Sequence, residues 1–247
     1  MRLFLCLSLI GLLHYAHAQK STFPDGLKKI SDEEVTRLKL EADSFPGYGP
    51  NGQLWTKVQV RNKTGLWRYR AEFYADEQGK VVAVKYQKRT HTERMSAISR
   101  AEEKRMNALV GTPAPDFEVS DMEGNHIKLS DLKGQIAVVN FWFTNCKYCR
   151  KEMPELNAIV EDYKDKPVKF IAIATDNKEE LDRFLKFYSF DYRIVPDGQS
   201  VVNTYKVLLF PSHLVVDQEG NITYFKSGDE SATTGILREK LDALLGQ

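Results

Sequence analysis

A short apolar segment, followed almost at once by two cysteines three residues apart, constrains this chain more than any other feature. Residues 136–142 have the pattern of a buried strand, and Cys146 and Cys149 stand at the start of a helix predicted over residues 147–163. Cysteines at this spacing, beside alternating strands and helices, are typical of a redox-active dithiol. The spacing also allows the two sulfurs to close on each other as a disulfide.

The start of a helix suits cysteine chemistry, because its first backbone N–H groups have no acceptor within the helix. Together with the helix dipole they favour a thiolate at Cys146. Cysteines in such motifs have pKa values of roughly 3.5 to 7.5, against about 8.5 for a free thiol. Cys146 is therefore expected to be the attacking sulfur, and Cys149, one turn deeper, to resolve a mixed disulfide.

Three other interpretations of the cysteine pair compete with this one. A structural disulfide needs only an oxidising compartment and stays open as an alternative. A zinc site would need a second cysteine pair or a Cys/His pair at ligand spacing, which the sequence lacks, so no metal is expected. Haem attachment requires histidine directly after the second cysteine, where this chain has Arg150.

Residues 1–18 have the pattern of a signal peptide. Arg2 provides a positive start, residues 3–13 an apolar core, and residues 16–18 a small-x-small cleavage site. The apolar run is too short to span a bilayer, and Cys6 inside it is expected to be lost. The mature chain would then keep two cysteines, both in the motif, in a compartment where disulfides persist. We expect export, with the bacterial periplasm as the destination.

The composition indicates a folded protein with no electrostatic signal for polyanions. The chain has 247 residues, 42% of them hydrophobic and 28% charged, which allows one large or two modest domains. Its formal charge of +1 falls to zero when residues 1–18 are removed, because they contain Arg2 and no acidic residue. A neutral chain without a basic patch gives no reason to expect binding to nucleic acid.

Residues 19–109 are predicted to form a small α+β domain. Ser31 begins a capping-box sequence, which predicts a helix to about residue 43. Alternating patterns in residues 52–90, at 54–60, 66–74 and 81–86, predict an antiparallel meander of about three strands. Its aromatic residues form either the core of this small sheet, which we favour, or a surface for a partner. Residues 91–109 predict an amphipathic helix.

The proline-rich segment 111–115 marks a domain boundary, beyond which strands and helices alternate. This alternation predicts an α/β domain over residues 110–247, with helices on both faces of a sheet. The predicted strands are 136–142, 168–174, 191–195, 213–217 and 221–226, and the predicted helices are 147–163, 178–188 and 233–245.

From about residue 111 onward the motifs resemble those of exported thioredoxin-like oxidoreductases of the TlpA/ResA type, in the redoxin (AhpC/TSA-related) group. The resemblance covers rather more than half of the chain and leaves residues 19–109 unexplained. The motifs that carry it are Gly111-x-Pro113-Ala114-Pro115-Asp116-Phe117, Val139-Asn140-Phe141-Trp142, Cys146-x-x-Cys149-Arg150-Lys151-Glu152-x-Pro154, Tyr205-x-Val207, Phe210-Pro211 and Val215-Val216-Asp217-x-x-Gly220.

This resemblance implies a three-layer thioredoxin-like domain with a central mixed sheet and the dithiol at the start of its main helix. It implies a cis Phe210-Pro211 peptide beside the disulfide, with the backbone at Phe210 pairing with an incoming substrate strand. The implied partners are a disulfide-containing exported protein and a membrane thiol-disulfide electron donor. Electrons enter through another dithiol, so no organic cofactor is expected.

The same resemblance suggests roles for side chains near the cysteines. Glu152 is implied as a base that deprotonates Cys149, although a solvated first-turn glutamate is an equal alternative. Trp142, Lys147 and Tyr148 are expected to contribute to substrate binding. For His213, a strand histidine satisfied by its surroundings is favoured over a place beside the cysteine pair.

Three functions follow from these patterns. The leading hypothesis is a thiol-disulfide oxidoreductase that reduces disulfides of exported proteins. A thiol peroxidase is weaker, because peroxiredoxins carry Thr or Ser three residues before the reactive cysteine, where this chain has Phe143. The third is a non-catalytic binding module with a structural disulfide. Lys147-Tyr148 matches neither of the best-known dipeptides between such cysteines, so the direction of electron flow stays open.

Overall fold

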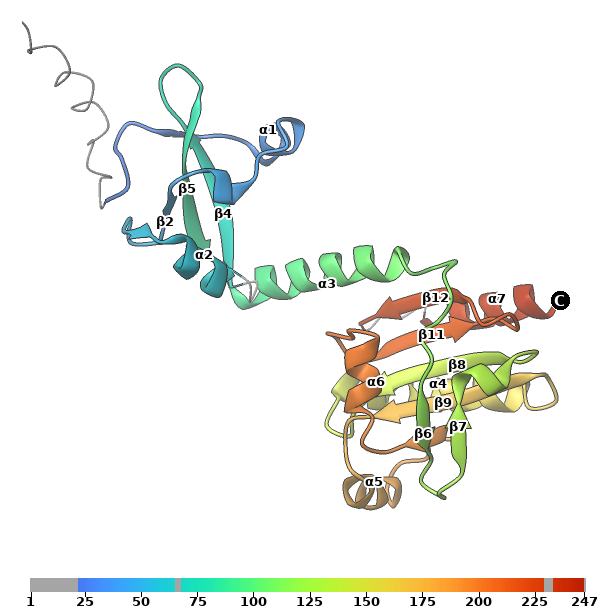
Figure 1. Ribbon diagram of the computed structural model, residues 1–247. Helices are drawn as coiled ribbons and strands as arrows, with labels where there is room; N and C mark the ends of the chain where they lie inside the picture. The colour runs from blue at the N-terminus through green and yellow to red at the C-terminus, as the bar shows by residue number, and fades with distance from the viewer. Residues whose placement is uncertain (1–21, 65–67, 229–232, 247) are drawn as a thin grey trace, which may run out of the picture. The chain divides into compact units, whose positions relative to one another are not determined.

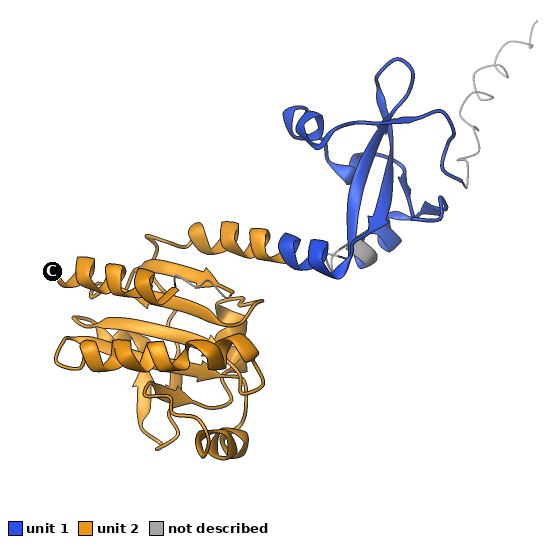
Figure 2. Cartoon of the chain, turned by 180° about the vertical axis from the view of Figure 1, so that it is seen from behind, with its two compact units in different colours: residues 1–97 blue, residues 98–247 orange. Residues whose placement is uncertain are grey.

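The computed structural model describes residues 22–64, 68–228 and 233–246, so the predicted signal peptide lies outside the described residues (Figure 1). The chain has two compact units, residues 1–97 and 98–247, and helix α3 (His91–Asn107) contributes residues to both (Figure 2). The predicted domains 19–109 and 110–247 stay a prediction. No helix in the described segments is long and apolar enough to cross a membrane.

The N-terminal unit contains a five-stranded sheet in the order β1-β4-β5-β2-β3. Its strands are β1 (Lys28–Lys29), β2 (Gly47–Tyr48), β3 (Leu54–Trp55), β4 (Tyr69–Ala75) and β5 (Val81–Lys88). The antiparallel β4–β5 hairpin forms its centre, and Trp55, Phe73, Val84 and Tyr86 form a buried cluster against it. Trp55 stacks on Tyr86 with ring centroids 5.5 Å apart. The predicted aromatic core is therefore present for Trp55 and Phe73.

The predicted strand over residues 54–60 is wrong beyond Trp55, because Lys57–Thr64 form helix α2. The cause is a capping box that the alternating pattern hid. The Thr56 hydroxyl accepts a hydrogen bond from the Gln59 backbone at 3.2 Å, and Gln59 Oε1 accepts one from the Thr56 backbone at 2.9 Å. Reciprocal bonds of this kind begin a helix by satisfying otherwise orphaned donors.

The first helix is shorter than the sequence predicts. Helix α1 spans Asp32–Arg37 and is capped at Ser31, whose hydroxyl accepts from the Glu34 backbone at 3.2 Å. Lys39 then adopts the left-handed conformation, with φ of +50°, and a short 3-10 helix follows at Ala42–Ser44. Because a left-handed residue cannot continue an α-helix, the predicted extension to residue 43 does not form.

The C-terminal unit is built on a mixed five-stranded sheet in the order β10-β9-β8-β11-β12. Strands β8 to β10 are parallel, and β11 is antiparallel to both β8 and β12. The strands are β8 (Ile136–Trp142), β9 (Val168–Ala174), β10 (Arg193–Val195), β11 (Ser212–Val216) and β12 (Ile222–Ser227). Sequence patterns also missed part of a small hairpin, β6 (Glu118–Ser120) with β7 (His126–Lys128).

Helices cover both faces of this sheet and give the expected three-layer thioredoxin-like architecture (Figure 1). On one face lie α4 (Lys147–Asp162), α5 (Lys178–Leu185) and α7 (Thr233–Leu245). On the other lie α6 (Gln199–Thr204), which the sequence analysis missed, and the last turns of α3, anchored by fully buried Met106. Each face buries its own apolar cluster, so β8 is buried along its whole length.

Candidate active site

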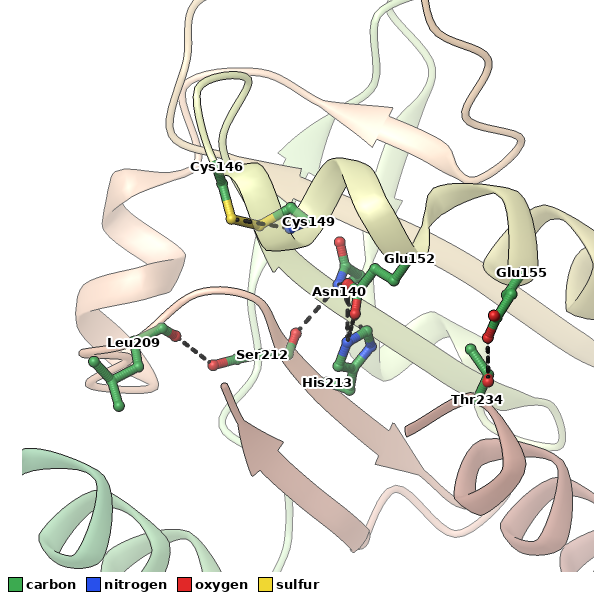
Figure 3. A network of polar contacts seen from close by, with 9 residues as sticks. All are labelled: Asn140, Cys146, Cys149, Glu152, Glu155, Leu209, Ser212, His213 and Thr234. Atoms are coloured by element: carbon green, nitrogen blue, oxygen red, sulfur yellow. Dashed lines mark hydrogen bonds and ion pairs between the residues drawn. A yellow bond between two sulfur atoms is a disulfide. The ribbon is translucent and has the colours of Figure 1, made fainter. Parts of the chain in front are cut away.

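The two cysteines lie where β8 passes into α4, and they form a disulfide with Cα atoms 5.3 Å apart (Figure 3). Cys146 is the N-cap residue of α4, with extended backbone angles. Its sulfur accepts a hydrogen bond from the backbone N–H of Cys149 at 3.1 Å. The attacking sulfur of the sequence hypothesis therefore takes the place that a Ser or Asp side chain takes in an ordinary helix cap.

The loop before the cysteines is anchored to the end of the neighbouring strand β9. Asp176 accepts hydrogen bonds from the Thr144 backbone at 2.8 Å and from the Thr144 hydroxyl at 2.7 Å. The oxidised pair is also well covered: Cys146 is 5% exposed and Cys149 is 1% exposed. Geometry alone therefore suits either a redox pair that opens for its partner or a buried structural disulfide.

The segment before β11 contributes a second loop to this region. The Phe210-Pro211 peptide is cis, as the resemblance implied. Pro211 is buried and Phe210 is half-buried. The Phe210 ring meets Phe143 edge-on at 5.4 Å between centroids, and both rings pack against the cluster that contains the two cysteines. The Ser212 hydroxyl donates to the Leu209 carbonyl at 2.7 Å and ties the loop to the start of β11.

Glu152 lies one turn beyond Cys149 on α4 and points into a polar cluster, as Figure 3 shows. Its side chain is 14% exposed. The Nε2 atom of His213 is 3.1 Å from Oε1 and 3.2 Å from Oε2, and the Asn140 amide donates to Oε1 at 3.4 Å. The solvated glutamate considered as an alternative is therefore not what the fold contains.

The polar contacts of His213 assign roles to its two ring nitrogens. Nδ1 of His213 faces the Asn140 amide nitrogen at 3.4 Å, and an amide nitrogen only donates. With this orientation of the Asn140 amide, Nδ1 is assigned as the acceptor and Nε2 as the donor to Glu152. Both His213 and Asn140 are 1% exposed. His213 is satisfied by its surroundings, as the sequence analysis favoured, and Glu152 is one of those surroundings.

Tyr192 brings another buried hydroxyl near this carboxylate. Burial, and secondly the charge of Glu152, raise the pKa of the Tyr192 phenol above its usual value. Its hydroxyl has no hydrogen-bond partner within the described segments. Sequence reasoning gave no role to Asn140 or Tyr192. For Asn140 a signal existed, since it is the one polar residue of the apolar run Ile136–Trp142.

The three remaining side chains predicted for substrate binding lie at different depths. Lys147 and Tyr148 are exposed in the first turn of α4, and Tyr148 is 50% exposed. Trp142 is fully buried between Phe184 and Phe190, with ring centroids 5.4 Å from each. Direct contact between Trp142 and a substrate, as expected from the sequence, is therefore corrected to a packing position in the core.

Comparisons with known proteins agree with this geometry. The model of the AhpC/TSA family matches residues 110–225. The thiol-disulfide oxidoreductase ResA of Bacillus cereus (strain ZK / E33L) is 37% identical over 124 residues, which cover 49% of this chain and 72% of that protein. The ResA protein of Geobacillus thermodenitrificans is 34% identical over 137 residues, covering 55% of this chain and 78% of that protein. The chain belongs to the AhpC/TSA family.

Solved structures of thioredoxin-like proteins match a similar share of the chain. The protein assigned as the thiol:disulfide interchange protein DsbE of Chlorobium tepidum has a TM-score of 0.52 and 27% identity, covering 56% of this chain and 98% of that one. A protein assigned as a disulfide isomerase in Bacteroides thetaiotaomicron, with a TM-score of 0.50 and 24% identity, shows the fold alone. Within the AhpC/TSA family, this chain is a thioredoxin-like thiol-disulfide oxidoreductase of the ResA type.

Burial of the cysteine pair does not distinguish a redox pair from a structural disulfide, but the family of the chain does. A non-catalytic module predicts a buried disulfide, and the observed pair is buried. The relatives, however, are named thiol-disulfide oxidoreductases, and the family model that matches residues 110–225 covers both cysteines. The match also has a clear limit: the family model begins at residue 110, so α3 and the whole N-terminal unit lie outside it.

Proposed function

We propose that the protein reduces disulfide bonds of exported proteins through the Cys146–Cys149 dithiol. The observation that carries the proposal is the disulfide at the start of α4, with the Cys146 sulfur capped by the Cys149 N–H and Glu152 held one turn below. The N-terminal signal pattern supports action outside the cytoplasm, in the periplasm of a bacterium.

The reaction balances as two thiol–disulfide exchanges. The Cys146 thiolate attacks one sulfur of the substrate disulfide, forms a mixed disulfide and releases the other substrate sulfur as a thiolate that takes up a proton. Cys149 then attacks the Cys146 sulfur, releases the second substrate thiol and leaves the oxidised pair seen in the structure. Two electrons pass to the substrate, and a membrane thiol-disulfide donor would return them without an organic cofactor.

Glu152 is proposed as the base for the second exchange. Cys149 must lose a proton to attack, and a carboxylate three residues further along the helix lies on the same face. The hydrogen bonds from His213 and Asn140 hold the Glu152 carboxylate inside the fold instead of letting it swing into water. In this proposal His213 and Asn140 are positioning residues.

Substrate binding is proposed to use the backbone at Phe210 and the exposed side chains at the start of α4. An extended substrate segment pairs with an exposed backbone mainly through main-chain hydrogen bonds, which accept many sequences. Buried Pro211 shapes this backbone, and Lys147 and Tyr148 offer a cation and an aromatic ring to the substrate. Phe210, half-buried against Phe143, adds an apolar wall.

The decisive experiment combines a redox titration with trapping. The mature protein is equilibrated in glutathione and dithiothreitol buffers, and a Cys149→Ala variant is mixed with two-chain insulin. We expect a stable adduct on Cys146, none with Cys146→Ala, and a midpoint towards the low end of the range of about −270 to −120 mV. A midpoint near the upper end would reverse the direction of transfer, and inertness across all buffers would remove the proposal.

The peroxidase alternative has its own test in the same variants. Hydrogen peroxide consumption that survives Cys149→Ser would assign the reactive sulfur to peroxide chemistry. The variant is informative because peroxide reduction needs only the first cysteine. We expect no such activity, because Phe143 stands where peroxiredoxins carry Thr or Ser.

A further inference from the structure

The last turns of α3 carry a buried carboxylate that binds the loop leading to the cis proline. The Glu102 side chain is fully buried, and its Oε1 accepts hydrogen bonds from the backbone N–H of Leu208 at 2.7 Å and of Leu209 at 3.3 Å. Its second oxygen has no hydrogen-bond partner within the described segments. Burying a carboxylate with one unsatisfied oxygen lowers the stability of the fold, so this position calls for an explanation other than stability.

Arg105 binds the other end of the same loop. Its guanidinium donates to the carbonyl of Tyr205 and to the carbonyl of Lys206, each at 3.0 Å, and it lies 3.9 Å from the Glu102 carboxylate. Neighbouring side chains on one helix thus hold carbonyls at the start of the loop and N–H groups at its end. Loop backbone with no strand or helix partner needs such side-chain contacts.

The loop itself is under conformational constraint. Lys206 has φ of +52°, a left-handed conformation that non-glycine residues adopt at a cost of roughly 1 kcal/mol or more. Such conformations persist where the surroundings dictate them, and they cluster at functional sites. Here the Arg105 hydrogen bond falls on the carbonyl of this residue, and the chain runs on directly through Leu208 and Leu209 to Phe210-Pro211.

We propose that Glu102 and Arg105 are positioning residues that fix the backbone of the 205–209 loop for docking of protein substrates. This inference rests on the proposed function and deepens it, by separating protein disulfides from small ones. A protein segment that pairs with the backbone at Phe210 needs that backbone in one place, whereas a small disulfide without a peptide backbone makes no such pairing. Neither residue lies within the segment that matches the family model, which begins at residue 110.

The test compares two substrates in three variants of the full mature chain. Glu102→Met removes the acceptor of the two loop N–H groups while keeping a side chain of similar length, and Arg105→Met removes both donors while keeping the aliphatic stem. Glu103→Met is the matched control, because Glu103 is the adjacent residue on α3 and pairs instead with Lys226 at 2.8 Å. The substrates are insulin, a protein disulfide, and bis-hydroxyethyl disulfide, which has no peptide backbone.

We expect Glu102→Met and Arg105→Met to lower kcat/KM for insulin about tenfold, mainly through KM. Turnover of bis-hydroxyethyl disulfide and the reduction potential should stay at the level of Glu103→Met. Equal behaviour of all three variants on insulin would overturn the inference. An equal loss on both substrates with a shifted potential would also overturn it, because the residues would then act through the dithiol.

A measurement on the unmodified protein covers the case in which a variant does not fold. The amide hydrogens of Leu208 and Leu209 should exchange as slowly as those of β11, because both donate to a fully buried carboxylate. Rapid exchange at both positions would show an unfixed loop and refute the inference. If the unmodified protein reduces neither substrate, the proposed function fails instead, so the two failures are distinguishable.

Discussion

Replacing His213 with leucine gives the sharpest test of the polar cluster behind the cysteines. The substitution removes His213 Nε2, which donates to Glu152, and His213 Nδ1, which accepts from the Asn140 amide. The bond lost runs from a neutral imidazole to a carboxylate, and a hydrogen bond to a charged group contributes about 1.5–3 kcal/mol. Glu152 keeps 14% exposure and the bond from Asn140, so we expect a loss of about 2 kcal/mol in unfolding free energy.

A double-mutant cycle separates this interaction from simple loss of packing. Glu152→Met removes the other partner, and the double variant contains neither the imidazole nor the carboxylate. Its loss of unfolding free energy should therefore be about 1.5 kcal/mol smaller than the sum of the two single losses. Glu155→Met is the matched control, because Glu155 lies one turn further along α4 and accepts from Thr234 at 2.7 Å instead (Figure 3). Its cycle with His213→Leu should be additive.

The assay is amide hydrogen exchange in β8 and β11 of the oxidised full chain. Slow exchange in these strands reports opening of the C-terminal unit, to which all the substituted residues belong. Additivity of His213→Leu and Glu152→Met within about 0.5 kcal/mol would refute the reasoning, because it would mean that the imidazole and the carboxylate do not stabilise each other in solution.

Three further predictions concern positions away from the cysteines. Burial alone would raise the pKa of Asp121, but hydrogen bonds, led by that from Arg193, hold this pKa below its usual value. The ionised Asp121 carboxylate therefore stabilises the fold, and this stabilisation should be lost as pH falls below about 4. In urea titrations, Asp121→Asn should lose less unfolding free energy on acidification than the unmodified protein. Tyr205→Phe removes a buried bond of 2.5 Å to a backbone carbonyl and should cost about 1–2 kcal/mol by exchange in β8. Thr56→Ala removes the hydroxyl that accepts from the Gln59 backbone in the capping box of α2. It should lower the unfolding free energy of the N-terminal unit by about 1 kcal/mol, measured by amide exchange in β5.

The centre of the C-terminal unit was predictable because its strands are buried on both faces. Strands of this kind are continuous apolar runs with polar borders, and the predicted limits 136–142 and 168–174 agree with β8 and β9. The predicted helices 147–163 and 233–245 likewise agree with α4 and with the last helix, α7, to within one residue. The information in these segments is local, so the sequence alone was sufficient.

The errors have local causes of a different kind. Residues 56–60 alternate like a strand, but the Thr56–Gln59 capping box begins a helix there, so a short-range bond overrode the period of two. Helix α6 (Gln199–Thr204) has only 6 residues, with Val201 and Val202 buried, and is too short to show a helical period. Length and competing signals, more than composition, limited these predictions.

The polar cluster could not be assembled from the sequence, because its members come from separate elements. Asn140 is on β8, Glu152 is on α4 and His213 is on β11, and the register that sets His213 opposite Asn140 exists only in the folded sheet. A sequence pattern places each residue on a face of its own element. It gives no information about which faces meet.

Residues that break the local rules of this fold nevertheless gather at two places. Asn140 and His213 are polar residues in strands buried along their whole length, and both bind Glu152. Glu102 is a fully buried acid on α3, and it binds the loop that leads to Phe210-Pro211. Buried polar groups cost stability unless they are hydrogen-bonded, and folds keep such groups where a specific arrangement is required. Both arrangements constrain segments that carry the proposed exchange, one behind Cys149 and one before the cis proline. The cost of burying these polar groups therefore falls where the positions of the dithiol and of the substrate-binding backbone must be defined.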